Sequence, residues 1–202
     1  SEQECEYRVW VVDNASSDGS PDMVRREFPD VELLVNAENQ GFAHANNRAI
    51  RRSEGEFVLL LNPDTIVPDR ALSRILDFLR RTPEAGMATA KLVKRDGSLD
   101  LACRRSFPDP FDGMCRAVGL SDLFPDSRIF ARYNLRYLDE DDIAEVEVVN
   151  GAFMMARREA VEEVGLLDED YFMYMEDLDW CYRFRQCGWK IFYVPTATVV
   201  HL

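Results

Sequence analysis

The chain has 202 residues, a formal net charge of −13 and a hydrophobic content of 47%. This length and apolar content suffice for one large domain with a buried core. The negative charge argues against a nucleic-acid partner, because binding a phosphate backbone requires a basic surface that releases counterions. The five cysteines are odd in number and contain no C-x-x-C pair, so neither a disulfide framework nor a zinc site is expected.

The first half of the chain predicts strands and helices in alternation. Strands are expected at residues 7–13, 31–35, 57–61 and 86–93, with helices that begin at Ser20, Gly41 and Pro68. Ser20 and Pro21 have the pattern of an N-cap and a first helical residue. Residues 57–61 are apolar without alternation, as in a central parallel strand that is covered on both faces. The Asp96–Gly97 pair predicts a hairpin turn.

Residues 104–145 lose this periodicity and predict a loop-rich sub-lobe. After them we expect a strand at 146–156, a helix at 158–164, an acidic helix from about Glu176 to Cys187, and strand segments at 190–194 and 199–201 on either side of Pro195. The arginine doublets, among them Arg104–Arg105, are expected at helix ends or in solvent. The order of elements predicts an α/β fold with crossover helices.

Polar residues follow three of the predicted strands, as Asp13–Asn14, Asn39–Gly41 and Asn62–Asp64. In an open α/β sheet, ligands bind beyond the carboxyl ends of the strands. A carboxylate there can accept hydrogen bonds from a base or a ribose, and Gly41 at a helix start can let phosphate approach backbone donors. Ordinary turn chemistry is the alternative for each group.

Asp64 and His201 are candidate metal ligands. Asp64 suits a hard divalent cation, and imidazole is a common ligand for manganese-like ions. Both residues end predicted strands, so we expect them close together at the carboxyl edge of the sheet. The alternative for Asp64 is a turn or a cap before Pro68, and that for His201 is a structural histidine. We assign His44, inside a predicted helix, a structural role.

The segment YFMYMEDLDWCY places Glu176, Asp177 and Asp179 among aromatic and thioether side chains. Desolvation there raises a carboxyl pKa toward the range of a general base. The alternative is that these acids only offset the positive end of a helix dipole. On one helix Asp177 and Asp179 diverge by about 200°, so only one of them can face a substrate.

Five blocks in this order resemble the inverting glycosyltransferases of family 2, especially the rhamnosyltransferase-like branch. They are VVDNASSDGS, NQGFAHANN, LLLNPDT, NGAFMMARREA and YFMYMEDLDWCYR. The resemblance covers nearly the whole chain. It implies a GT-A fold with a mixed, mostly parallel sheet flanked by helices, a nucleotide-diphosphate sugar donor, and Mn²⁺ or Mg²⁺ as cofactor. It also implies one domain, 1–202, with a nucleotide-sugar-binding part at 1–103 and an acceptor and catalytic part at 146–202.

The resemblance also implies roles for single residues. Asp177 matches the general base that deprotonates the acceptor, with Glu176 as its partner, and Asp64 and His201 match the metal site. Asp13 matches the residue that recognises the base. The full set assigned to the donor is Asp13, Asn14, Ser16, Gly41, Asn47 and Asn62.

The implied reaction is transfer with inversion from a dTDP- or UDP-linked sugar, with dTDP-rhamnose suggested by the branch, to a hydroxyl of a saccharide or lipid-linked acceptor. Family members normally begin one strand and one helix earlier and continue past His201, so we interpret the chain as a truncated domain that is folded but not necessarily active.

The expected location of the protein is the cytoplasm, with peripheral contact to the inner face of the membrane in a full-length protein. A sugar-phosphate nucleotidyltransferase and a non-catalytic nucleotide-binding domain are the alternatives.

Overall fold

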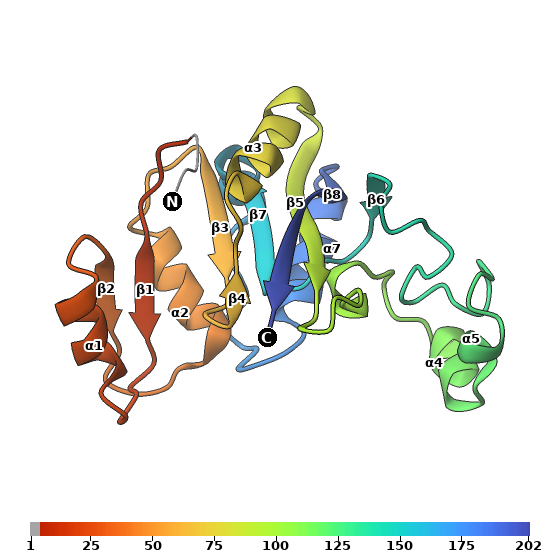
Figure 1. Cartoon of the computed structure of the whole chain (residues 1–202), viewed down its shortest axis with the longest axis horizontal. Helices are drawn as coiled ribbons and strands as arrows, with labels where there is room; N and C mark the ends of the chain where they lie inside the picture. Colours follow the sequence, from red (N-terminus) through yellow and green to blue (C-terminus); the bar gives the residue numbers. More distant parts are fainter. Residues whose placement is uncertain (1–4) are drawn as a thin grey trace.

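The computed structural model describes residues 5–202, and Figure 1 shows the elements. The strands are β1 (Trp10–Asp13), β2 (Glu32–Val35), β3 (Phe57–Leu61), β4 (Thr65–Ile66), β5 (Ala85–Val93), β6 (Ala144–Val146), β7 (Phe153–Arg157) and β8 (Lys190–His201). The helices are α1 (Ser20–Glu27), α2 (Gly41–Ile50), α3 (Ala71–Arg81), α4 (Pro110–Ala117), α5 (Leu120–Leu123), α6 (Arg158–Val164) and α7 (Glu176–Gln186), with a 3-10 turn η1 (Leu101–Cys103). This order confirms the predicted α/β class.

The strands form two sheets. A six-stranded sheet has the order β3-β7-β5-β8-β4 with β6 paired to β8, and a separate sheet holds β1 and β2. The β1/β2 and β5/β8 pairs are parallel, and the other pairs are antiparallel, so the arrangement is mixed. Figure 1 shows β1 and β2 beside β3, and no backbone pairing joins β1 to β3 within residues 5–202.

Five local predictions are wrong. The helix expected from Pro68 begins at Ala71, with Arg70 as its N-cap. Strand β3 is neither central nor parallel, because it ends the six-stranded order and pairs antiparallel with β7, and buried residues alternate along it. The strand predicted at 146–156 is divided into β6 and β7 by a turn. Strand β8 continues through Pro195 as one strand, with a register shift beside it between Ala90 and Lys91. Gly19, with φ 87°, is the N-cap of α1 instead of Ser20.

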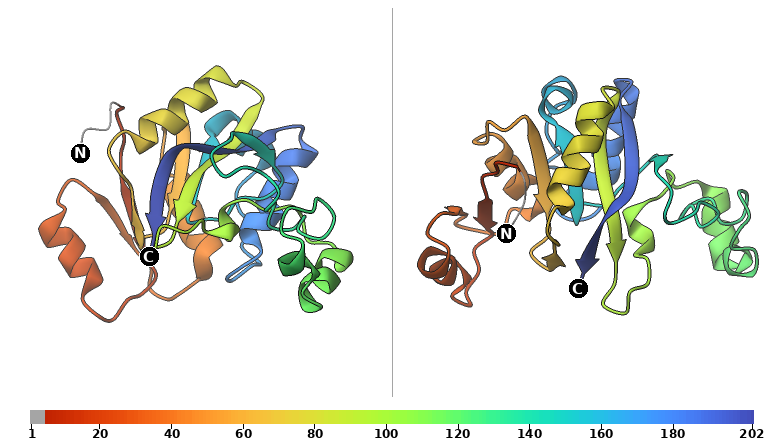
Figure 2. Two further views of the ribbon diagram at one scale, coloured as in Figure 1. Left: turned by 45° about the vertical axis from the view of Figure 1, so that its right-hand side comes forward. Right: turned by 45° about the horizontal axis from the view of Figure 1, so that its top comes forward.

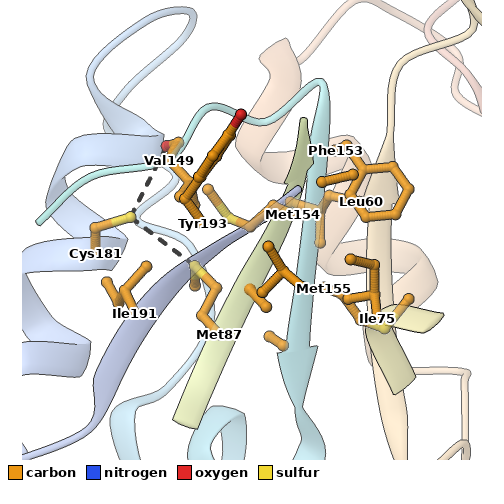
Figure 3. Packing of buried hydrophobic residues seen from close by; sticks show 14 of the residues in the cluster. Leu60, Ile75, Met87, Val149, Phe153, Met154, Met155, Cys181, Ile191 and Tyr193 are labelled. Carbon is orange, nitrogen blue, oxygen red and sulfur yellow. Dashed lines mark hydrogen bonds between the residues drawn. The ribbon is translucent and has the colours of Figure 1, made fainter. Parts of the chain in front are cut away.

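Helices cover both faces of the six-stranded sheet. Helix α3 packs on β5 and β8 from one side, and α6 and α7 pack on the other (Figure 2). Figure 3 shows Cys181 of α7 pointing toward Met87 and Val149, while Ile75 of α3 lies beside Met155. Burial raises the pKa of Cys181 to about 12. This cysteine therefore packs as an apolar residue.

The predicted sub-lobe at 104–145 contains α4 and α5 and projects from the end of the sheet (Figure 1). Its first residues anchor it to the core. Arg105 forms an antiparallel bridge with Val148, and the Arg104 guanidinium donates to the carbonyl oxygens of Leu138 and Asp139 over the ring of Tyr193. Among the described residues, no helix is long and apolar enough to cross a membrane.

Candidate functional site

The strands β1, β3 and β8 all point with their carboxyl ends toward the lower side of the molecule in Figure 1. Asp13 ends β1, His201 ends β8, and Asp64 lies in the turn between β3 and β4. The pairing of β4 with β8 sets Thr65 opposite His201, and the Leu202 N–H donates to the Asp64 carbonyl at 2.8 Å. The backbone therefore brings Asp64 and His201 together although they are far apart in the sequence.

The distance between His201 Nε2 and Asp64 Oδ1 is 3.5 Å, which confirms the predicted proximity. Asp64 does not cap α3, whose N-cap is Arg70 without a side-chain cap bond. Within residues 5–202, no three His, Cys, Asp or Glu side chains are arranged as a complete cation cluster. Asp64 and His201 nevertheless fit a Mn²⁺-like ion, because they offer one carboxylate and one imidazole and leave coordination positions for substrate oxygens and water.

The turn after β1 is held by its own side chains. Asp13 is 8% exposed, and its Oδ2 accepts a hydrogen bond from the Ser16 N–H at 3.0 Å. Asn14 accepts from Asn36 Nδ2 and donates to the Gly41 carbonyl at 3.1 Å. Asn14 therefore joins the turn to β2 and α2, and donor binding by Asp13, Asn14 and Ser16 stays a prediction. The sequence reasoning missed Asn36, which no local pattern distinguishes from a turn residue.

Gly41 has a packing role that the sequence did not predict. Its φ is +88°, and an added Cβ would lie 2.3 Å from the Phe172 carbonyl oxygen. Its N–H bonds to Asn39 Oδ1, and the Phe42 N–H bonds to the Phe172 carbonyl. These two N–H groups therefore have partners within the protein, and the missing Cβ of Gly41 lets Phe172 pack against the start of α2. Donor binding at Gly41 stays a prediction.

Asn47 also differs from its assignment to the donor. The residue is fully buried, its Nδ2 donates to Leu167 O and Glu169 Oε1, and its Oδ1 accepts from the Leu167 N–H. These bonds join α2 to the loop after α6 and leave no exposed surface for a sugar. Asn62 shapes the turn that presents Asp64, since its N–H bonds to Ala152 and its carbonyl accepts from Thr65. Its contact with the donor stays a prediction.

Glu169 connects several of these groups. It accepts hydrogen bonds from Asn47, His44 and Arg51, and these bonds, led by that from Asn47, lower its pKa to about 2. The pairing of His44 with Glu169 at 2.7 Å agrees with a structural role for this histidine.

We expect Glu169→Gln to be less stable than the wild type at pH 7. A carboxyl whose pKa is lowered by folding stabilises the native state above its unfolded pKa of about 4.3 and loses that contribution as the pH falls through about 2. The stability difference between the two proteins should therefore shrink between pH 4.5 and 2. Urea denaturation at pH 7, 4 and 2.5 measures it, with Glu162→Gln on the exposed side of α6 as control. A difference that does not change with pH contradicts the assignment.

Helix α7 separates the two aspartates as predicted. Asp179 pairs with Arg183 one turn along the helix at 2.8 Å, whereas Asp177 pairs with Arg105 of the sub-lobe at 2.6 Å. Both side chains of the second pair are only 16% exposed. Arg105 was expected at a helix end or in solvent. This is wrong, because its backbone forms a bridge with Val148 and its side chain is mostly buried against Asp177.

The turn that leads into α7 is strained and exposed. Tyr174 and Met175 have φ of 67° and 74°, values that cost free energy for residues other than glycine. Tyr174 is 78% exposed, while Glu176, two residues later, is 6% exposed. Burial raises the pKa of Glu176, and its Oε2 has no hydrogen-bond partner among residues 5–202. A strained turn beside a desolvated carboxyl is typical of a binding or catalytic site.

Residues 3–202 match the family model described as glycosyltransferase-like family 2. The chain belongs to this family. It is 33% identical, over 96% of its length, to an N-acetylglucosaminyl-diphospho-decaprenol L-rhamnosyltransferase of Mycobacterium tuberculosis, and it spans 66% of that relative.

Solved structures show that this family 2 domain has the GT-A fold. A mannosyltransferase from Pyrobaculum calidifontis in complex with GDP-Man and Mn²⁺ matches with a TM-score of 0.64 and 24% identity, over 98% of this chain and 49% of that one. GalNAc-T7 with UDP, GalNAc and Mn²⁺ matches with a TM-score of 0.66 and 15% identity, over 96% and 37%. The fold and the rhamnosyltransferase-like resemblance predicted from the sequence are therefore confirmed.

Proposed function

We propose that this domain transfers a sugar, with inversion, from a nucleoside-diphosphate donor to a hydroxyl of a saccharide or lipid-linked acceptor. The observation that carries the proposal is the approach of Asp64 to His201, 3.5 Å apart, at the carboxyl end of β8 in the six-stranded sheet. The relative from M. tuberculosis, named a rhamnosyltransferase for a diphospho-decaprenol acceptor, supports a dTDP-rhamnose donor and an acceptor at a membrane face. A UDP-linked sugar is the second candidate donor.

In the proposed reaction, one group of residues binds the donor and another residue activates the acceptor on the opposite side of the anomeric carbon. Asp13 binds the base, and Asp64 and His201 would hold the cation. A bound divalent cation offsets charge on the leaving diphosphate. On the opposite side, the acceptor oxygen forms its bond to the anomeric carbon as the bond to the diphosphate oxygen breaks, and Asp177 takes the hydroxyl proton.

Arg105 leaves Asp177 able to act as this base. The guanidinium occupies Asp177 Oδ2, and the Leu178 N–H bonds to Oδ1. A carboxylate oxygen has two acceptor sites, so each oxygen keeps one for the acceptor hydroxyl.

The similar proteins give no support to the two alternative functions, a nucleotidyltransferase and a non-catalytic nucleotide-binding domain.

Nucleotide binding tests the donor side. We expect dTDP or UDP with Mn²⁺ to raise the melting temperature of the wild-type chain, because a ligand that binds only the native state stabilises it by about 2.7 kcal/mol at 100 times its Kd. Asp13→Ala should reduce this shift, and Asp64→Asn should remove its dependence on Mn²⁺. Asp18→Ala, an exposed residue of the same loop, is the control. An unchanged nucleotide-induced shift in Asp13→Ala would rule out base recognition by Asp13.

A further inference from the structure

His201 lies between two carboxylates that approach different ring nitrogens. Asp100 Oδ2 is 3.1 Å from Nδ1, and Asp64 Oδ1 is 3.5 Å from Nε2. An ordinary N–H···O bond spans about 2.7–3.2 Å, so only the contact with Asp100 has the length of a hydrogen bond. Because the two nitrogens point away from each other, the two acids cannot both face one cation that is bound by this ring.

The backbone holds Asp100 in this position. Its N–H donates to Leu92 O at 2.9 Å, which closes the hairpin that follows β5. Its Oδ1 accepts from the Ala102 N–H at 3.0 Å and so caps η1. The side chain is 15% exposed. The two carboxylate oxygens therefore have separate partners, since Oδ1 caps the 3-10 turn and Oδ2 faces the imidazole.

We propose that Asp100 is a positioning residue that holds the proton of neutral His201 on Nδ1. The lone pair of the ring then lies on Nε2, the nitrogen that faces Asp64 and that would bind the cation. A carboxylate that accepts the other ring N–H of a metal-binding histidine fixes its tautomer and raises its strength as a ligand. The metal-binding consequence rests on the proposed function, whereas the tautomer does not.

The variant Asp100→Asn tests the tautomer because asparagine has only one side-chain oxygen for these two partners. If that oxygen keeps the cap on Ala102, the amide NH₂ faces His201 and can only donate to Nδ1. The ring proton must then move to Nε2, which removes the lone pair that faces Asp64. The cap on η1 is retained in this arrangement, so the fold is expected to survive.

Nitrogen NMR of ¹⁵N-histidine-labelled protein reads the tautomer directly and needs no metal. The chain has only two histidines, and His44→Gln assigns their signals. At about pH 9, well above the ordinary imidazole pKa of about 6.5, we expect His201 to be the Nδ1–H form in the wild type and the Nε2–H form in Asp100→Asn. An Nε2–H form in the wild type, or an unchanged tautomer in the variant, would overturn the proposal.

Binding of Mn²⁺ alone, measured by the EPR signal of the free ion, tests the consequence for the metal. Asp100→Asn is expected to weaken the affinity by roughly 10–100-fold, the usual effect of removing such a partner. The matched control is Asp96→Asn, which removes the same charge from the same hairpin. Asp96 lines the same cleft of about 450 Å³ as Asp100 and His201 but bonds to Ser98 instead. Its substitution should leave the affinity unchanged within about twofold.

The outcomes separate the two proposals. An equal loss of affinity in both variants, or no loss in Asp100→Asn, contradicts the positioning role of Asp100. Absence of Mn²⁺ binding by the wild type, together with the expected tautomers, overturns the metal site of the proposed function and supports the assignment of Asp100 to the histidine.

Discussion

Asp177→Asn is expected to lower the rate of sugar transfer by roughly 10²–10⁴-fold, the usual cost of removing a general base. An amide cannot take the proton of the acceptor hydroxyl, while Asp64 and His201 remain in place for the cation. Donor and Mn²⁺ binding should therefore be retained. Initial rates of transfer from dTDP-rhamnose to a lipid-linked acceptor measure the effect. The variant is compared with a wild-type protein that shows this activity.

Two further variants separate chemistry from folding. Asp179→Asn removes the same charge from the same helix but breaks only the pair with Arg183, so its transfer rate should stay near that of the wild type. Asp177→Asn also leaves the guanidinium of Arg105 without its carboxylate partner. Loss of one partner costs about 3–5 kcal/mol in a fully buried pair and less here, where both side chains are 16% exposed. Arg105→Gln combined with Asp177→Asn should recover stability but not transfer.

Near-normal transfer by Asp177→Asn would contradict its role as base. A large loss confined to Asp179→Asn would move that role to the other carboxylate. Recovery of transfer in the double variant would show that the single substitution had acted through folding.

Gly41→Ala is expected to destabilise the domain by about 2–5 kcal/mol. Placing a side chain at φ +88° costs about 1–2 kcal/mol. The new Cβ would also lie 2.3 Å from the backbone oxygen of Phe172, and relief of such overpacking costs about 1–3 kcal/mol more. Because a backbone atom cannot rotate away as a side chain can, residues 171–175 must shift. Denaturant unfolding measures the loss.

Gly19→Ala is the matched control for this effect. Gly19 has φ +87°, but an added Cβ there meets nothing within 4 Å. The difference between the two variants therefore isolates the contact between α2 and the 171–175 loop. If Gly19→Ala costs as much as Gly41→Ala, the loss comes from the backbone conformation alone, and the packing role of Gly41 is wrong.

Helices, strands and turns that are specified by a few neighbouring residues were predictable from the sequence. The bounds of β3 and α6 agree with the predicted ranges, because an apolar run followed by Asn62–Pro63 and a helical period ended by Gly165 both act over a few residues. The Asp96–Gly97 turn formed for the same reason, since the Lys94 N–H bonds to Ser98 O across it. The proximity of Asp64 and His201 was predicted from the shared carboxyl edge of the sheet. The short strand β4, which pairs with the end of β8 and brings the two residues together, was not predicted.

The pairing of distant polar groups, in contrast, required the folded structure. Arg105 and Asp177 are 72 residues apart, and Asp100 and His201 are 101 apart. An arginine beside an acid, or an aspartate after a turn, has the same local pattern whether its partner is water or a distant side chain. Likewise, Asn47 has the pattern of a polar residue in an amphipathic helix, and only the loop at Leu167 buries it. Burial and pairing across such separations are decided when the chain packs, so residue types alone could not predict them.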